Sequence, residues 1–224
     1  MSESLSRGER VERYVDERAR ALQAAYHRDD SAAVADLALL RRGVGKHPSA
    51  DVVLFGLATG DQEGAERTTL HAPGTRLSDD EPSREEMAAF AALTLFAMHQ
   101  QSRRDASMHR HGYSMGRSAR LLGRQSNARD AVRARFAALG TAASWDETLH
   151  HARGVIQQLR QHSIPLDYGR FARDLFDLRD PAAADRVRNA WGRDFYRATH
   201  PEDDPPEGDA SAGDARAASE STDD

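Results

Sequence analysis

The chain has 224 residues, of which 39% are hydrophobic and 30% charged, and its formal net charge is −5. Its longest largely apolar run, Met87 to Met98, falls short of the roughly 20 residues that a membrane helix needs, so we expect a globular protein with no membrane partner. The absence of cysteine excludes disulfides, thiolate catalysis and cysteine-ligated zinc. The first residues do not resemble an export signal, which predicts a cytoplasmic location.

Charge is distributed unevenly along the chain. Residues 201–224 contain nine acidic residues and one arginine, a net charge of −8. A segment so acidic and so poor in bulky apolar groups cannot bury enough surface to fold, which predicts a disordered acidic C-terminal tail. Residues 1–200 carry a net charge of +3 and make up the single domain that we expect. Within them, residues 103–160 hold 11 arginines against four acids.

Apolar residues recur three and four positions apart, and no long alternating stretch is present, which predicts an all-α fold. We expect one helical bundle of eight or nine helices. In chain order, the first helix runs from about Gly8 to His27, the second from Ser31 to Gly43, and the third begins near Pro48. Residues 61–82 then form a polar loop, which at this length is either functional or mobile.

Four further helix starts are indicated by capping and first-turn residues: Ser83, Ser144, Asp167 and Pro181. The first two are followed three residues later by a glutamate, Glu86 and Glu147, which is the spacing of a capping box. The Met87–Met98 run after Ser83 predicts a core helix.

The helix expected after Ser114 has an apolar face and an arginine face. At about 100° per residue, one face holds three apolar residues: Met115, Ala119 and Leu122. The opposite face holds only cations and is expected to lie in solvent: Arg117, Arg120 and Arg124.

Two later helices repeat this arrangement. One has a core stripe flanked by arginines on both sides: Val132, Phe136 and Leu139, with Arg129 and Arg133 on one side and Arg135 on the other. The next has a predicted buried set: Trp145, Leu149, Ala152, Ile156 and Leu159. Beside that set runs a second row without acids: His150, Arg153, Gln157 and Arg160.

Some arginines have a simple structural interpretation. We expect those of the first helix to pair with acids of the same helix: Arg10, Arg13, Arg18 and Arg20. Arg170 and Arg173 have Asp174 and Asp177 four residues on. For Arg41 and Arg42, one interpretation is that they complement the C-terminal end of a helix dipole.

The acid-poor rows need a different explanation, because like charges three or four residues apart destabilise a helix. An anionic partner would compensate, and the planar guanidinium suits phosphate, which favours a nucleic-acid backbone. Lys46 is the only lysine of the chain, so the choice of arginine also reflects a chain-wide bias.

The histidines and tryptophans offer weaker alternatives. A metal site could draw on four histidines: His109, His111, His150 and His151. The first two lie in a presumed loop, the second two cannot share one helix face, and no HExxH motif is present. We find no nucleophile or nucleotide motif and therefore expect no catalysis, cofactor or metal. Trp145 and Trp191 have the spacing of core residues, which we prefer to a base-stacking platform.

Six segments, taken in order, are similar to the CasB family, the small subunit of the type I-E CRISPR Cascade effector complex. They are LALLRRGVG, FAALTLFAMHQQS, SMGRSARLL, ARFAAL, LHHARGVIQQLRQHSIPLDYGRFARDLFDL and VRNAWGRDFY, from Leu37 to Tyr196. The 61–82 loop and the acidic tail depart from the family pattern.

The resemblance implies an all-helical, non-catalytic subunit in antiviral defence, present as a pair among the other Cascade subunits. It implies RNA and DNA binding along the heteroduplex of crRNA and target DNA, and along the displaced strand, without reading sequence. Carried over by position, it implies six phosphate contacts: Arg41, Arg42, Arg117, Arg120, Arg133 and Arg135. Three more candidates rest on the helix faces alone: Arg124, Arg153 and Arg160.

Two rival functions use the same arginines. A free-standing all-helical DNA-binding regulator would discriminate between an operator and random DNA by roughly 10³ or more. An adaptor for acidic proteins would bind no nucleic acid.

Overall fold

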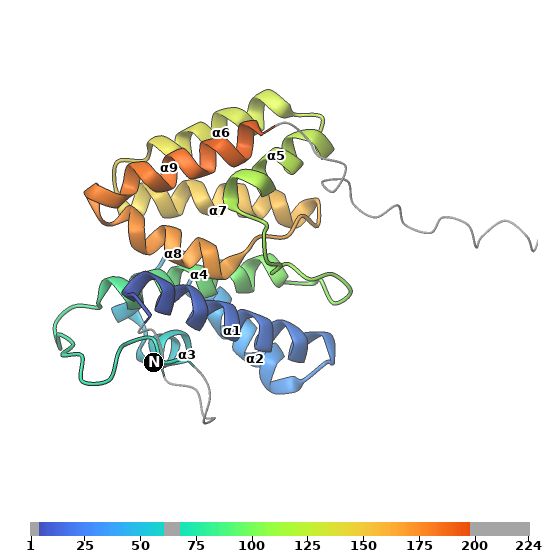
Figure 1. The fold of residues 1–224 in the computed structure, drawn as a ribbon. Coiled ribbons are helices and arrows are strands. Elements are labelled where there is room, and N and C mark those ends of the chain that lie inside the picture. The colour runs from blue at the N-terminus through green and yellow to red at the C-terminus, as the bar shows by residue number, and fades with distance from the viewer. Residues whose placement is uncertain (1–4, 61–67, 198–224) are drawn as a thin grey trace, which may run out of the picture.

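The protein is all-α. A computed structural model describes residues 5–60 and 68–197, and within these residues the chain forms nine α-helices, one short 3₁₀ helix and no strand (Figure 1). The elements are α1 (Arg7–His27), α2 (Ser31–Arg41), η1 (Pro48–Ala50), α3 (Val52–Thr59), α4 (Arg84–Gln100), α5 (Met115–Gln125), α6 (Arg129–Thr141), α7 (Trp145–Gln161), α8 (Tyr168–Leu178) and α9 (Pro181–Tyr196).

Side-chain caps begin most of these helices. Ser83 and Glu86 form the predicted capping box of α4, and Asp167 caps α8. Helix α2 begins at Ser31 as predicted, with Asp30 as its cap, but it ends at Arg41 instead of Gly43. One cap differs from expectation. At α7 the Ser144 hydroxyl accepts from the Glu147 amide, but the Glu147 carboxylate accepts from the amide of residue 143 instead of that of its own cap.

Helix α4 lies at the centre of the fold. Every residue of α4 except Arg84 is buried, which confirms the core helix predicted from the Met87–Met98 run. It packs against α1, α2, α3, α7 and α8. A helix that is apolar on all sides must be covered by neighbours on all sides. These five helices surround α4 and provide that cover.

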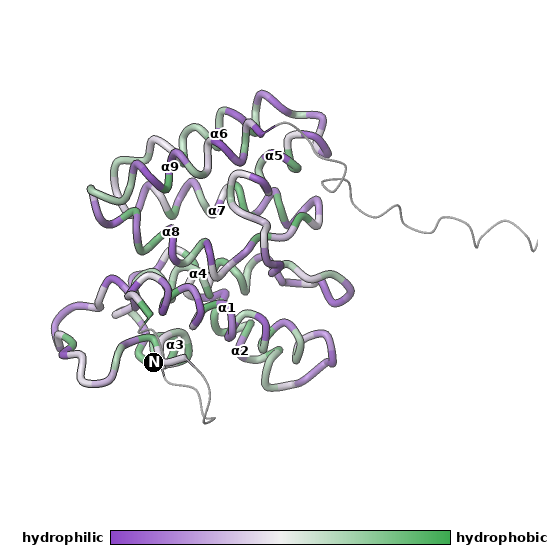
Figure 2. The backbone as a smooth tube through the Cα atoms, viewed as in Figure 1, coloured by the Kyte–Doolittle hydropathy of each residue, from purple (hydrophilic) through white to green (hydrophobic). Residues whose placement is uncertain are grey.

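The remaining helices extend the bundle on one side of α4. Helix α8 packs on α1 and α4, α9 packs on α8 and α5, and α6 packs on α5 and α7. Figure 1 shows α5, α6 and α9 at one end and α1, α2 and α3 at the other. Hydrophilic and hydrophobic residues alternate along α6 and α9 in Figure 2, as expected for helices with one face in the core. The predicted stripe of α6 is buried: Val132, Phe136 and Leu139.

The described part of the long polar loop is anchored to the bundle. Residues 68–82 contain no helix, as predicted, but Leu70 is buried in the core. Thr68 donates from its backbone amide and its hydroxyl to the Glu17 carboxylate. Residues 61–67 of the loop and the predicted tail 201–224 lie outside the described residues. None of the described helices combines the length and the apolar character that a membrane span requires.

Candidate nucleic-acid interface

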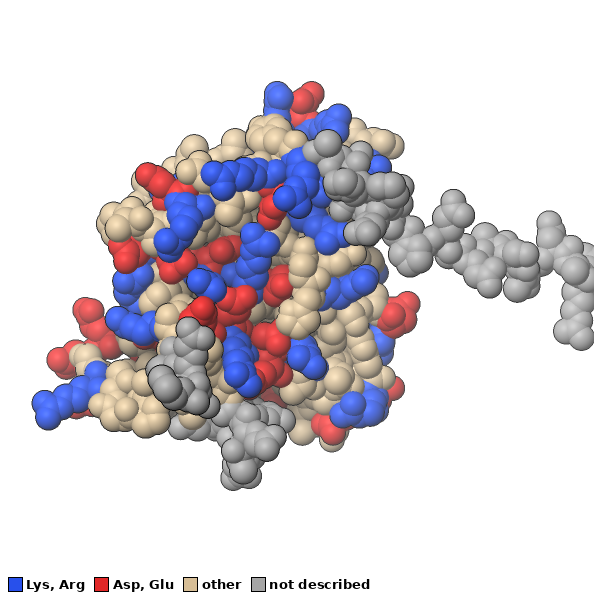
Figure 3. Space-filling model, viewed as in Figure 1, with Lys and Arg blue, Asp and Glu red and all other residues tan. Residues whose placement is uncertain are grey.

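Arginines on α1, α8 and α9 are mostly paired with acids. Arg13 binds Glu17 at 2.9 Å and Arg20 lies 3.6 Å from Asp16, as predicted for the first helix. Arg170 binds Asp194 on α9 at 3.2 Å, instead of the expected Asp174. In Figure 3, red and blue side chains interleave over α1 and α8. Such a surface is nearly neutral at short range.

Three further arginines of α1 and α8 bind acids or backbone carbonyls. Arg173 binds Glu12 at 3.0 Å and lies 4.0 Å from the expected Asp177. Arg10 donates to the carbonyl of Leu5 and Arg18 to that of Leu57. The predicted pairing within α1 is therefore confirmed for Arg13 and Arg20.

Helix α5 carries three of the predicted contact residues, but in unlike environments. Arg117 donates to the carbonyl of Gly112 at 3.2 Å, and its guanidinium carbon lies 4.4 Å from the ring centre of Tyr113. Arg124 is exposed, whereas Arg120 is only 8% exposed. The prediction of a purely cationic solvent face was therefore wrong at Arg120. The physical reason is that α5 contacts α6, α7 and α9, so more than its apolar stripe is covered.

Helix α6 presents its predicted arginines to solvent. Arg133 and Arg135 are exposed, and Arg133 lies 3.5 Å from Asp130 one turn earlier. An exposed pair of this kind contributes little, roughly 0–1 kcal/mol. Within the described residues, Arg135 makes no ion pair or side-chain hydrogen bond. The arginines of α5 and α6 are carried by two helices that pack against each other. Blue side chains gather where α5 meets the end of α9 in Figure 3.

A second group lies where α2 ends and α7 passes α4. Arg41 is half-buried in the last turn of α2 and Arg42 is exposed at its C-cap, so the helix-dipole interpretation remains open for both. On α7, Arg153 is exposed, and its Nη1 lies 4.0 Å from the place that a side chain on Gly45 would occupy. The structure thus brings Arg153 to the loop that follows Arg42.

Arg160 occupies a third position, at the far end of α7. Its Nε donates to the carbonyl of Gln101 at 3.1 Å, and Arg103 donates to the carbonyl of Arg160 at 2.7 Å. Both cations therefore tie the end of α4 to the end of α7. The nine predicted arginines occupy several surfaces of the bundle rather than a single patch.

Comparison with known proteins identifies the family. Residues 36–196 match the family described as CRISPR-associated protein Cse2. The chain belongs to the Cse2 family. It is similar to the crystal structure of CasB from Thermobifida fusca, with 38% sequence identity and a TM-score of 0.70, over 86% of this chain and 99% of that one. No curated protein matches the chain. This confirms the resemblance to the type I-E Cascade small subunit. All nine predicted arginines lie in the matched range.

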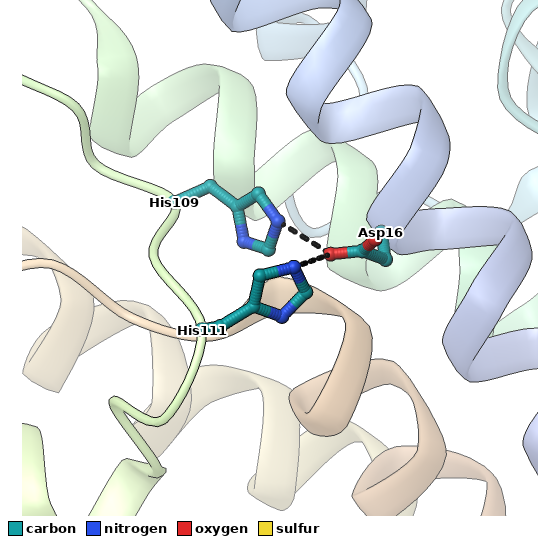
Figure 4. Close-up of side chains that lie close together, drawn as sticks. All are labelled: Asp16, His109 and His111. Carbon is teal, nitrogen blue, oxygen red and sulfur yellow. Dashed lines mark hydrogen bonds and ion pairs between the residues drawn. The ribbon is translucent and has the colours of Figure 1, made fainter.

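This Cse2-family chain also joins two of the histidines considered for a metal site, His109 and His111, to a carboxylate that the sequence did not indicate. Figure 4 shows the rings of His109 and His111 pointing at the carboxylate of Asp16, which comes from α1. The Nε2 atoms lie 2.8 Å and 3.2 Å from the same oxygen, Oδ1. Two imidazoles and a carboxylate could in principle hold a zinc ion.

Hydrogen bonding around His109 argues against that use. The backbone amide of Tyr168 donates to Nδ1 of His109 at 3.1 Å. Nδ1 must therefore be unprotonated, so the proton of the neutral ring is on Nε2, where it is donated to Asp16. A metal ligand needs a free lone pair on Nε2, and this donor set does not fit one. The cluster instead fastens the segment around His109 to α1, together with the two hydrogen bonds between Gln23 and the His109 backbone.

The two tryptophans differ in burial. Trp191 is 1% exposed and donates from Nε1 to Asp174 at 2.6 Å, which confirms the core interpretation. Trp145 is only partly buried, and the guanidinium carbon of Arg179 lies 5.1 Å from its ring centre. Leu149, also predicted to be buried, is partly buried as well. The first turns of α7 are therefore open on one side.

Proposed function

We propose that this chain is a non-catalytic small subunit of an RNA-guided surveillance complex in the cytoplasm, in antiviral defence. It binds sugar-phosphate backbones without reading sequence, and it stabilises the heteroduplex of crRNA and target DNA and the displaced strand. Its protein partners are the other Cascade subunits and a second copy of itself.

One observation carries this proposal: a set of exposed cations that carboxylates do not neutralise. Within residues 5–60 and 68–197, Arg42, Arg135 and Arg153 make no ion pair. On the α1 and α8 surface, by contrast, arginines and acids alternate. When an unneutralised guanidinium group contacts a phosphate, counterions condensed on the nucleic acid are released into solution. This release favours binding to a nucleic acid of any sequence.

Salt dependence tests the proposal. The double substitution Arg135→Ala and Arg153→Ala is expected to weaken binding to single-stranded DNA and to reduce the slope of log K against log salt. The expected reduction is about 0.7 for each lost contact. Fluorescence anisotropy with labelled oligonucleotides of several unrelated sequences, between low and moderate salt, measures both quantities.

The matched control removes the same charge from ion-paired positions. Arg13→Ala with Arg20→Ala also lowers the net charge by two, but each of these arginines already has a carboxylate partner. We expect the control to leave the slope nearly unchanged. Equal slopes for both double variants would contradict backbone contacts at Arg135 and Arg153.

The same assay separates the rival functions. A regulator would prefer one sequence by roughly 10³ or more, and an adaptor would bind neither strand. A pull-down with the other Cascade subunits and crRNA tests the assembly directly, and it fails to recover them if the chain acts alone.

A further inference from the structure

A hollow in the described structure lies between α4, α7 and the loop after α2. Its volume is about 490 Å³, within the range of roughly 300–1,000 Å³ that small-molecule sites occupy. Phe90 and Leu95 of α4 form part of its floor, and Leu149 of α7 forms part of a wall. The hollow therefore offers an apolar surface that is open to solvent at one side.

The loop that forms one rim is held in a fixed shape. Gly43 is pressed onto the bundle, because a side-chain carbon there would lie 2.6 Å from Leu54 and 2.8 Å from Thr94. Gly45 has a φ of +78°, a left-handed conformation that glycine adopts without strain. The amide of Lys46 donates to the carbonyl of Gly43 at 2.9 Å, which closes a turn. The rim is thus formed before any ligand arrives.

Two cationic side chains, Lys46 and Arg153, lie at this rim. Lys46 and Arg153 are both exposed and both line the hollow, together with the imidazoles of His47 and His150. In the described part of the chain, neither Lys46 nor Arg153 makes an ion pair or a side-chain hydrogen bond. The lining includes one carboxylate, that of Asp146, seven residues before Arg153 and so about 10 Å away along α7. The rim near Arg153 is accordingly positive.

An aromatic ring lies at the other end. Trp145, Leu149 and Arg153 follow one another at intervals of four residues, so they form a row along one side of α7. Trp145 is partly buried, and the guanidinium of Arg179 beside its ring holds it in place. The row therefore runs from an aromatic group through an apolar one to a cation.

We propose that this hollow is a binding site for one unstacked nucleotide of a single strand. The base lies against Trp145 and the apolar floor, and the phosphate lies between Lys46 and Arg153. Aromatic rings bind bases of any sequence by stacking, and cations bind the backbone. A nucleotide matches both halves of the site, whereas a simple anion would leave the apolar floor unused. The inference rests on the proposed function and adds to it a place where a base leaves the stack.

Mononucleotides test the site without a long backbone. Thymidine 5′-monophosphate added to the full chain is expected to quench the fluorescence of Trp145 saturably. Thymidine alone and deoxyribose 5-phosphate alone are expected to bind roughly tenfold more weakly or worse, because each engages one half of the site; tenfold corresponds to about 1.4 kcal/mol. A Trp145→Phe variant identifies the reporter, since Trp191 is buried.

Arg153→Ala and Arg135→Ala form a matched pair of variants. Both remove one exposed arginine and are expected to lower the salt slope for oligonucleotides alike, but only Arg153 lines the hollow. We expect Arg153→Ala to weaken binding of the mononucleotide about tenfold or more and Arg135→Ala to leave it unchanged.

Three results would overturn the inference: no quenching by the mononucleotide, equal binding by either half-ligand, or equal loss in both variants. If oligonucleotides still bind in these cases, the backbone function stands and the site alone fails. If no oligonucleotide binds the native chain, the proposed function itself fails.

Discussion

Asp174 of α8 is a half-buried residue whose carboxylate accepts a hydrogen bond from Trp191 of α9. Burial raises its pKa to about 7, and the nearby charges of Asp177 and Glu12 act in the same direction. The hydrogen bond from Trp191 and the charge of Arg170 oppose the shift. Because the folded protein holds this proton up to a higher pH than the unfolded chain does, the contribution of Asp174 to stability is greatest at low pH. It is lost as the pH rises from about 4 through 7.

The substitution Asp174→Asn tests this coupling. Asparagine retains an oxygen that accepts from Trp191 and cannot ionise, so the variant lacks the cost of a buried charge. We expect the advantage of the variant over the native protein in the free energy of unfolding to grow by about 1–3 kcal/mol between pH 5 and pH 8. Urea unfolding at the two pH values measures it.

His99 changes stability with pH in the opposite sense, and its contribution cancels in this comparison. Burial lowers its pKa to about 3, so stability falls as the pH drops below about 6.5. Both proteins share this effect. A difference between the Asp174→Asn variant and the native protein that is the same at pH 5 and pH 8 would refute the assignment for Asp174.

At the scale of elements, a glycine sets the distance between α5 and α9. A side-chain carbon on Gly116 would lie 2.1 Å from the carbonyl oxygen of Trp191 and 3.0 Å from the amide of Phe195. Both are backbone atoms of α9 and cannot rotate away. We expect Gly116→Ala to force the helices apart and to lower the free energy of unfolding by about 1–3 kcal/mol or more, measured by urea denaturation.

A second glycine on the same pair of helices provides the control. Gly192 also lies within α9, but a side-chain carbon there meets nothing within 4 Å. Alanine at this position gains helix propensity, so we expect Gly192→Ala to be stabilising by roughly 0.5–1 kcal/mol. Loss of stability in both variants would mean that close packing at Gly116 is not the cause.

Periodicity and caps predicted the helices well, because both are local properties. The starts at Ser83 and Asp167 and the buried stripe of α6 follow from residues within one or two turns. Arg120, which was predicted to be exposed and is buried, shows the limit of local prediction. An apolar stripe indicates one packing surface of a helix, and α5 contacts three other helices. Which surface the other contacts cover depends on the packing of the whole bundle.

The site was less predictable than the fold, because its parts are distant in sequence. Asp16 and His109 are 93 residues apart, so no spacing rule could join them. Arg153 was identified from its helix row, yet its nearness to Gly45 depends on how α2 and α7 pack on α4. The role of Arg179 beside Trp145 gave no sequence signal at all.

At the scale of the whole molecule, the acidic segment 201–224 opposes the charge of the remainder. Its net charge of −8 turns a body of +3 into a chain of −5. If it acts by charge, deletion of residues 201–224 is expected to accelerate association with single-stranded DNA by roughly tenfold at low salt, and less at higher salt. Stopped-flow fluorescence measures the rate.

A full-length variant with the tail acids replaced by their amides is the control for length. It should match the deletion if charge is the cause. Association rates that neither change alters would leave the segment a role in solubility alone.

The alternation of arginines and acids over α1 and α8 has a consequence for how the molecule meets a strand. The charge of residues 1–200 is distributed asymmetrically, because among the described residues arginines are paired with acids over α1 and α8 but not at Arg42, Arg135 and Arg153. A polyanion at a distance of one or two Debye lengths exerts a torque on such a particle. Under the proposed function, this torque would turn the protein toward the strand before the first contact and leave the neutral flank over α1 and α8 facing away.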